Sequence, residues 1–158
     1  LNSHASSNRR GKLSLELAVR LAVKRTGMEE NGVDYSAFQF AHPIEEEFAR
    51  ILDYYGIPWE YEPRSFAQKW DEKGNVKVGF APDFYLPDQD LYVELTTLRP
   101  KLVTKKNRKI RRMNELYPEI NVQLWKRSDL RNLMLRFGMD EHVINIMGTD
   151  SQNSKQNE

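Results

Sequence analysis

The sequence contains no cysteine among its 158 residues. This absence excludes disulfides, cysteine-based zinc sites and a thiol nucleophile, and it favours a reducing compartment such as the cytoplasm. No apolar run approaches the ~20 residues that a membrane-spanning helix needs, so we expect no membrane partner. Histidine is scarce, with three residues, and none has a second histidine at a spacing typical of metal ligands. A glycine-rich phosphate loop and a serine-centred nucleophile elbow are also missing.

The composition is that of an ordinary soluble globular protein, with 39% hydrophobic and 30% charged residues and a net charge of +1. The chain is long enough for one domain with a real core. We expect residues 1–41 to form an N-terminal tail with an accessory helix over about 13–26. Residues 42–138 are expected to form the main domain, and residues 139–158 a C-terminal tail.

Hydrophobic periodicity predicts the elements of the main domain. A helix that His42 caps, with Pro43 in its first turn, ends at Gly56. Its predicted buried face has apolar residues at helical spacing: Ile44, Phe48, Ile51, Leu52 and Tyr55. The pattern next predicts strands at 59–62 and 76–80, with an edge strand or loop at 66–70 between them, and a hairpin of strands at 84–86 and 91–93. After the hairpin it predicts a helix at about 105–117, a strand at 120–126 and a short helix at about 130–137. This order predicts a small α/β domain whose mixed sheet is an antiparallel meander followed by a helical crossover to a parallel strand.

Two acidic residues stand beside the strands of the predicted hairpin. Asp83 precedes the first strand and Glu94 follows the second, and the turn formers Pro87, Asp88 and Asp90 lie between the strands. A carboxylate beside a buried strand is unfavourable unless something pairs with it. Because the hairpin places both acids on neighbouring strands, we expect them to share a hard cation such as Mg²⁺.

The order of elements and the acidic residues resemble the PD-(D/E)XK nuclease superfamily. A helix carrying glutamates is followed by a β-meander, a helix and a strand, with the dipeptide Pro82-Asp83 and, after ten intervening residues, Glu94. The resemblance covers residues 42–138. It implies a restriction-endonuclease-like core (αβββαβ) with a central mixed four-stranded sheet flanked by helices. It also implies a Mg²⁺-dependent nuclease, with Mn²⁺ as a substitute metal, that cleaves phosphodiester bonds, in DNA above all and as an endonuclease. Asp83, Glu94 and the backbone carbonyl of Leu95 would hold the metal. Many members act as dimers, so a homodimer is possible, although no dimer surface is readable here.

The sequence departs from this superfamily at one position. The motif lysine two residues after the glutamate is replaced by Thr96, which carries no positive charge. The helix that follows offers a replacement: on helical geometry Lys106 projects near the centre of the buried face, one turn before Ile110. We favour Lys106, with Lys109 and Lys101 as alternatives. Thr96 retains a hydroxyl that can bond a water molecule or a phosphate.

The first helix offers three candidates for the glutamate that often completes such sites. On helical geometry Glu46 points away from the buried face, while Glu45 and Glu47 flank it on opposite sides. In the superfamily this glutamate typically lies three residues before the next apolar core residue, which favours Glu45, ahead of Phe48. Three acids near a helix start are also explained by the helix dipole alone.

Residues 99–112 contain eight basic residues and no acidic one. Solvent-exposed helix faces usually mix charges of both signs, so this asymmetry favours contact with a phosphate backbone. The candidates for nucleic-acid contact are Lys101, Lys105, Arg108, Lys109 and Arg112.

Three hypotheses follow. The first is a metal-dependent nuclease with Asp83, Glu94, Glu45, Thr96 and Lys106 at its site. The second is a catalytically inactive nucleic-acid-binding module on a nuclease-like fold. The third is a protein-interaction domain within a larger assembly. Thr96 is the feature that separates the first two.

Overall fold

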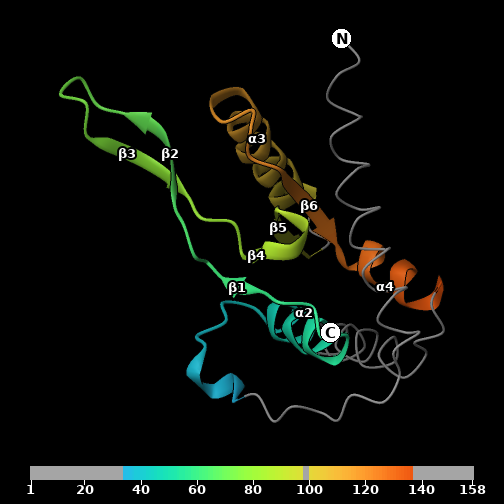
Figure 1. Ribbon diagram of the computed structural model, residues 1–158. Coiled ribbons are helices and arrows are strands. Elements are labelled where there is room, and N and C mark those ends of the chain that lie inside the picture. The colour runs from blue at the N-terminus through green and yellow to red at the C-terminus, as the bar shows by residue number, and fades with distance from the viewer. Residues whose placement is uncertain (1–33, 98–99, 137–158) are drawn as a thin grey trace, which may run out of the picture.

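The computed structural model describes residues 34–97 and 100–136 (Figure 1). In this part of the chain the helices are α2 (Pro43–Tyr54), α3 (Pro100–Leu116) and α4 (Arg127–Arg136), with 3-10 turns η1 (Tyr35–Ala37) and η2 (Pro87–Gln89). The strands are β1 (Glu60–Tyr61), β2 (Phe66–Trp70), β3 (Val76–Phe80), β4 (Phe84–Leu86), β5 (Leu91–Thr96) and β6 (Val122–Lys126). The accessory helix expected at 13–26 and the tail 139–158 lie outside the described residues. No described helix has the length and apolar character needed to cross a membrane.

Four strands form the main sheet, in the order β1-β4-β5-β6. The β1–β4 and β4–β5 pairs are antiparallel, and α3 carries the chain across to β6, which pairs with β5 in parallel. The predicted hairpin is present: η2 connects β4 to β5, and Asp90 ends it with φ 45°, a left-handed conformation that aspartate tolerates. The predicted α/β domain with a mixed four-stranded sheet is therefore confirmed.

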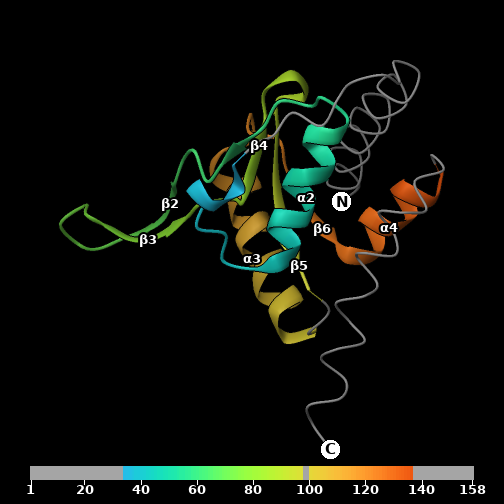
Figure 2. The same cartoon turned by 90° about the horizontal axis from the view of Figure 1, so that it is seen from below.

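The predicted meander is interrupted by a second sheet. β2 and β3 pair only with each other, as a two-stranded antiparallel sheet. The chain leaves the main sheet after β1 because Glu62 has φ 42° and Pro63 cannot donate a ladder hydrogen bond. This also explains why β1 is shorter than the strand expected at 59–62. We call residues 66–80 the arm, because they project away from the helices and the main sheet in both views (Figures 1 and 2).

The predicted helix boundaries hold at α2 and shift at the two later helices. His42 caps α2, its Nδ1 accepting from the Ile44 amide at 3.3 Å, and Pro43 is the first helical residue. α3 begins at Pro100 rather than near residue 105, since proline suits a first helical turn. α4 begins at Arg127 rather than near residue 130. The Asp129 carboxylate accepts from the Lys126 amide at 3.0 Å and so caps the helix earlier than Ser128 would.

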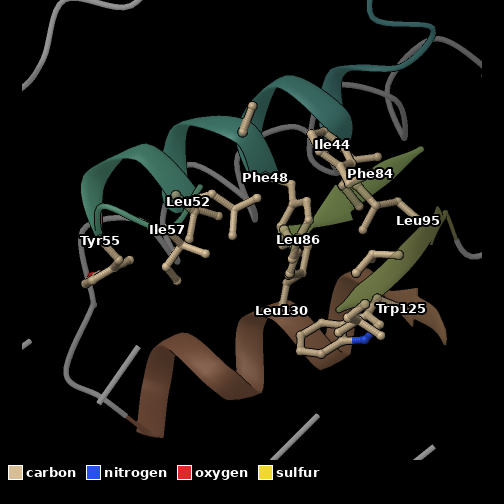
Figure 3. Packing of buried hydrophobic residues seen from close by; sticks show 14 residues of the cluster. Ile44, Phe48, Leu52, Tyr55, Ile57, Phe84, Leu86, Leu95, Trp125 and Leu130 are labelled. Atoms are coloured by element: carbon tan, nitrogen blue, oxygen red, sulfur yellow. The ribbon is translucent and has the colours of Figure 1, made fainter. Parts of the chain in front are cut away.

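Two hydrophobic cores lie on opposite faces of the main sheet. One packs α2 and α4 against the sheet and contains every residue of the buried face predicted for α2, together with Phe84, Leu95 and Trp125 (Figure 3). The other packs α3 and the base of the arm against the sheet through Tyr92, Met113 and Phe66. Because side chains alternate along a strand, Leu91, Val93 and Leu95 of β5 face the first core, whereas Tyr92, Glu94 and Thr96 face α3.

The segment before α2 packs on the first core, although we expected residues up to 41 to belong to an N-terminal tail. The rings of Phe38 and Phe40 lie 5.0 and 4.8 Å from those of Trp59 and Tyr61, respectively. The Asp53 carboxylate accepts from the Tyr35 hydroxyl and, at 2.7 Å, from the Trp59 indole. This segment therefore packs beside β1 and the last turn of α2.

Candidate functional site

The centre of the candidate site is a pair of buried carboxylates on adjacent strands. Phe84 and Val93 are register partners, so Asp83, one residue before, lies opposite Glu94, one residue after. Their exposed fractions are 7% and 6%. The backbone amide of Leu95 donates to Asp83 Oδ2 at 2.7 Å and fixes this carboxylate against β5. The sequence placed these two acids on neighbouring strands, and the structure brings them together.

Lys106 is the cation that touches this pair. Its amine lies 2.8 Å from Glu94 Oε1 and also donates a hydrogen bond to the carbonyl oxygen of Leu95. The contact arises because α3 packs on the face of β5 that carries Glu94 and Thr96. The amine therefore reaches from α3 to two of the groups expected to hold a metal.

The alternative lysines lie elsewhere. The Lys109 amine stands over the Phe80 ring, 5.4 Å from its centroid, and its charge is near enough to lower the pKa of Glu94. Lys101 is exposed, and no described contact joins it to either carboxylate. Of the three candidates, Lys106 is the one that contacts a carboxylate of the pair.

The electrostatics of the pair favour a bound cation. The pKa of Asp83 is raised to about 7, mainly by burial and next by the negative charge of Glu94. The Leu95 amide and Lys106 act in the opposite direction and lower this pKa. Burial also raises the pKa of Glu94, although Lys106 opposes this shift. One ammonium therefore does not compensate two buried carboxylates, and the pair readily binds a proton or a second positive charge.

Glu45 stands beside the pair but is engaged by its own partners. It is buried, and its Oε2 accepts from the Ala41 amide at 2.9 Å and from the Tyr61 hydroxyl at 2.8 Å. Its charge contributes to the raised pKa of Asp83, so the two carboxylates interact through space. Glu46 points outward and pairs with Arg50 at 2.6 Å. Among the described residues, no three His, Cys, Asp or Glu side chains converge into a metal-binding group.

Thr96 occupies the motif position on the same face of β5 as Glu94. It is buried, and its hydroxyl donates to the Thr97 carbonyl at 3.1 Å. The hydroxyl is therefore occupied by a backbone group in this structure.

Two residues, one near His42 and one bonded to Glu45, were not predicted from the sequence. Arg127 is buried where β6 ends, directly after the register pair Thr96 and Lys126. Burial, together with the positive charges of Arg127 and Lys106, lowers the pKa of His42, while Glu45 opposes this shift. Tyr61 is the second residue that was not predicted, and its hydroxyl donates a hydrogen bond to Glu45. The alternation in 59–62 gave a weak signal for Tyr61, but no local pattern marked Arg127, which depends on the parallel pairing of β6 with β5.

The predicted nucleic-acid residues lie mainly on the open side of α3. Those with exposed side chains are Lys101, Lys105, Arg108 and Arg112, while Lys109 is half-buried against the arm. Arg112 pairs with Glu115 at 3.2 Å, a surface contact of little energetic weight. Arg99 lies outside the described residues. This side of α3 is therefore strongly positive.

Comparisons with protein-family models, with curated proteins and with solved structures found no match for this chain. Its function is therefore argued from the geometry and charge of the site.

Proposed function

We propose that this chain is a Mg²⁺-dependent nuclease of the PD-(D/E)XK type, that its main sheet is a restriction-endonuclease-like core, and that it hydrolyses phosphodiester bonds in DNA. The observation that carries the proposal is the contact of the Lys106 amine with Glu94 and the Leu95 carbonyl. A lysine beside the two carboxylates is the component that Thr96 leaves missing. The geometry of α3 supplies it from a different element.

The donor set fits a hard divalent cation. Glu94 Oε2 is buried and no described donor lies in good hydrogen-bond geometry to it, although the Asp83 backbone amide is near enough to lower the pKa of Glu94. This carboxylate oxygen is therefore left for a further ligand. Asp83, Glu94 and the Leu95 carbonyl offer only oxygen atoms, which Mg²⁺ and Mn²⁺ prefer, and Mg²⁺ usually keeps several waters. When bound, such an ion neutralises charge on a phosphate oxygen and lowers the pKa of a coordinated water molecule.

The protein's own groups have distinct roles in this proposal. The Leu95 amide holds Asp83 in place, and Tyr61 holds Glu45 near it. The Lys106 ammonium, 29% exposed, can turn from Glu94 toward an attacking water or a phosphate oxygen. The basic side of α3 binds the phosphate backbone on either side of the scissile bond. Arg127, at the end of β6, adds positive charge near His42 at the start of α2.

A second function has one observation in its favour. The Lys106 amine contacts Glu94 Oε1 and the Leu95 carbonyl, which are oxygens that a metal would use. If the amine stays there, the charge of Glu94 is already partly compensated without a metal. The chain would then be an inactive nucleic-acid-binding module that retains the basic side of α3.

A cleavage assay separates the two functions. Plasmid, single-stranded and branched DNA are incubated with the protein and Mg²⁺ or Mn²⁺, and Asp83→Asn is compared with the wild type. We expect Asp83→Asn to lose about a hundredfold or more in rate, because even indirect partners of metal ligands contribute about 10–100-fold. Asp88→Asn is the matched control, since Asp88 is an exposed residue in the turn of the same hairpin. Equal rates for wild type and Asp83→Asn would refute the metal assignment. An absence of cleavage with salt-sensitive DNA binding would support the inactive module.

A further inference from the structure

The arm exposes an aromatic and apolar surface that the nuclease site does not use. Trp70 is 44% exposed and Val76 58% exposed, and the two are direct cross-strand partners near the tip. The next pair toward the base is Lys69 with Val78, which is also exposed. Residues directly opposite each other share a face of the hairpin, so Trp70 and Val76 form one continuous apolar surface. An exposed indole offers a flat π face on which another ring can stack.

The arm is hydrogen-bonded both at its base and at its tip. At the base, Phe66 and Phe80 are buried, Gln68 Nε2 donates to the Lys109 carbonyl at 2.8 Å, and the Tyr117 hydroxyl donates to the Ala67 carbonyl at 2.9 Å. At the tip, the Asp71 carboxylate accepts from the amides of residues 73 and 75 at 2.9 and 2.8 Å. The backbone that carries Trp70 is therefore fixed by its pairing with Val76 and by the turn, which lowers the entropic cost of binding.

The charge of the arm is compatible with an anionic partner. Residues 66–80 contain three basic residues and two acidic ones, and one of the acids, Asp71, is engaged inside the turn. Arg64 adds a further positive charge at the base, where its guanidinium stands over the Phe66 ring. The arm also adjoins the positive side of α3 through Lys109, which stands over Phe80. Lys101, Lys105, Arg108 and Arg112 lie within roughly 100° of Lys109 around the α3 axis. The base of the arm therefore adjoins the basic side of α3, and the exposed indole lies farther out, toward the tip.

From these observations we infer that the arm binds single-stranded nucleic acid, with a base stacked on Trp70 and with phosphates near Lys69, Lys73 and Lys77. Stacking needs an exposed base face, which a single strand offers and an intact duplex does not. A second copy of this chain fits less well, because pairing two arms would bring like-charged lysines together. The inference rests on the proposed nucleic-acid partner but not on cleavage, since the arm lies outside the carboxylate site.

The test measures binding of the full chain to labelled oligo-dT, oligo-U and a duplex in EDTA, where metal-dependent cleavage is absent. We expect Trp70→Ala to weaken binding to the single strands by about tenfold, with Trp70→Phe close to wild type and duplex binding little changed. Tyr54→Ala is the matched control, because Tyr54 is another exposed aromatic residue, 52% exposed on α2. A preference for oligo-dT or oligo-U identifies the natural strand as DNA or RNA.

Three outcomes would overturn the inference. The first is equal affinity of wild type and Trp70→Ala for both single strands. The second is an equal loss for Tyr54→Ala, which would indicate a general surface effect. The third is concentration-dependent self-association that Trp70→Ala abolishes while strand binding is unchanged, which would assign the arm to a second copy. Because no metal is present, failure of the cleavage assay leaves this result intact, and the reverse also holds.

Discussion

Replacing Asp83 by asparagine should stabilise the metal-free protein although it removes the proposed activity. Asparagine keeps an oxygen acceptor for the Leu95 amide, which now donates to Asp83 Oδ2 at 2.7 Å. It replaces a buried negative charge, opposite Glu94, with a neutral group. Lys106 then has a single carboxylate to compensate, at 2.8 Å. Function and stability therefore respond to this change in opposite directions, as at many sites that hold like charges together.

The magnitude follows from the pKa of Asp83, which is about 7 in the folded protein and 3.8 ordinarily. Between these values the folded state binds the proton more strongly than the unfolded state, so the free energy of unfolding falls as pH rises and levels off above pH 7. From pH 5 to pH 8 the wild type should lose about 2–3 kcal/mol through this group, which Asp83→Asn does not lose. In melting temperature this corresponds to about 5–10 °C.

The assay is thermal unfolding of wild type, Asp83→Asn and the control Asp88→Asn in EDTA at several pH values, repeated with Mg²⁺ at pH 8. The difference between Asp83→Asn and wild type should grow from pH 5 to pH 8, while Asp88→Asn follows the wild type. Mg²⁺ should raise the melting temperature of the wild type but not of Asp83→Asn. The reasoning fails if Asp83→Asn is the less stable protein at pH 8, or if its pH dependence matches that of the wild type.

Two further changes test the groups around the pair. Lys106→Met leaves Glu94 buried without its cation and should lower the free energy of unfolding by about 2–4 kcal/mol at pH 8 in EDTA. The loss should be smaller at pH 5, because bound protons then replace the missing positive charge. Melting curves that show the same loss at both pH values would contradict this. Tyr61→Phe removes the 2.8 Å hydrogen bond to Glu45 and should cost about 1–3 kcal/mol in denaturant unfolding. Tyr85→Phe, which loses a bond to Asp90 on the exposed hairpin turn, should cost much less.

The local parts of the fold were predictable because their signals are local. His42, Pro43 and the apolar face from Ile44 to Tyr55 fix α2, and the turn formers between 86 and 91 fix the β4–β5 hairpin. That hairpin alone places Asp83 opposite Glu94, since a short turn sets the register. The pair of acids could therefore be located from the sequence before any tertiary contact was known.

What could not be predicted depends on tertiary pairing. The separation of β2 and β3 from the main sheet follows from the backbone at Glu62, which has φ 42°, and no side-chain pattern encodes that angle. The position of Arg127 near His42 depends on β6 lying parallel to β5, in a register that pairs Thr96 with Lys126. Helical geometry placed Lys106 on the side of α3 that faces the sheet, but the contact with Glu94 depends on how α3 packs on β5.

The last prediction concerns Thr96 and Lys106 as a coupled pair. Both side chains face the region between β5 and α3, and Thr96 is buried there. A lysine at position 96 would therefore compete with the Lys106 side chain for the same space. Thr96→Lys alone should be destabilised by about 1–3 kcal/mol through overpacking and the repulsion of two ammonium groups. Lys106→Met alone should lose cleavage activity by about a hundredfold or more, as expected for loss of a group that positions or moves a proton.

The double variant tests whether a lysine at position 96 can take over the role of Lys106, or whether the two substitutions act independently. If the site requires only an ammonium beside Glu94, Thr96→Lys combined with Lys106→Met restores the superfamily arrangement and should regain a measurable part of both stability and cleavage. A double-mutant cycle on both quantities measures this coupling. If the losses of stability and of cleavage rate are strictly additive, Lys106 acts through its position on α3 and not through its charge alone. The site would then not be a rearranged version of the superfamily pattern.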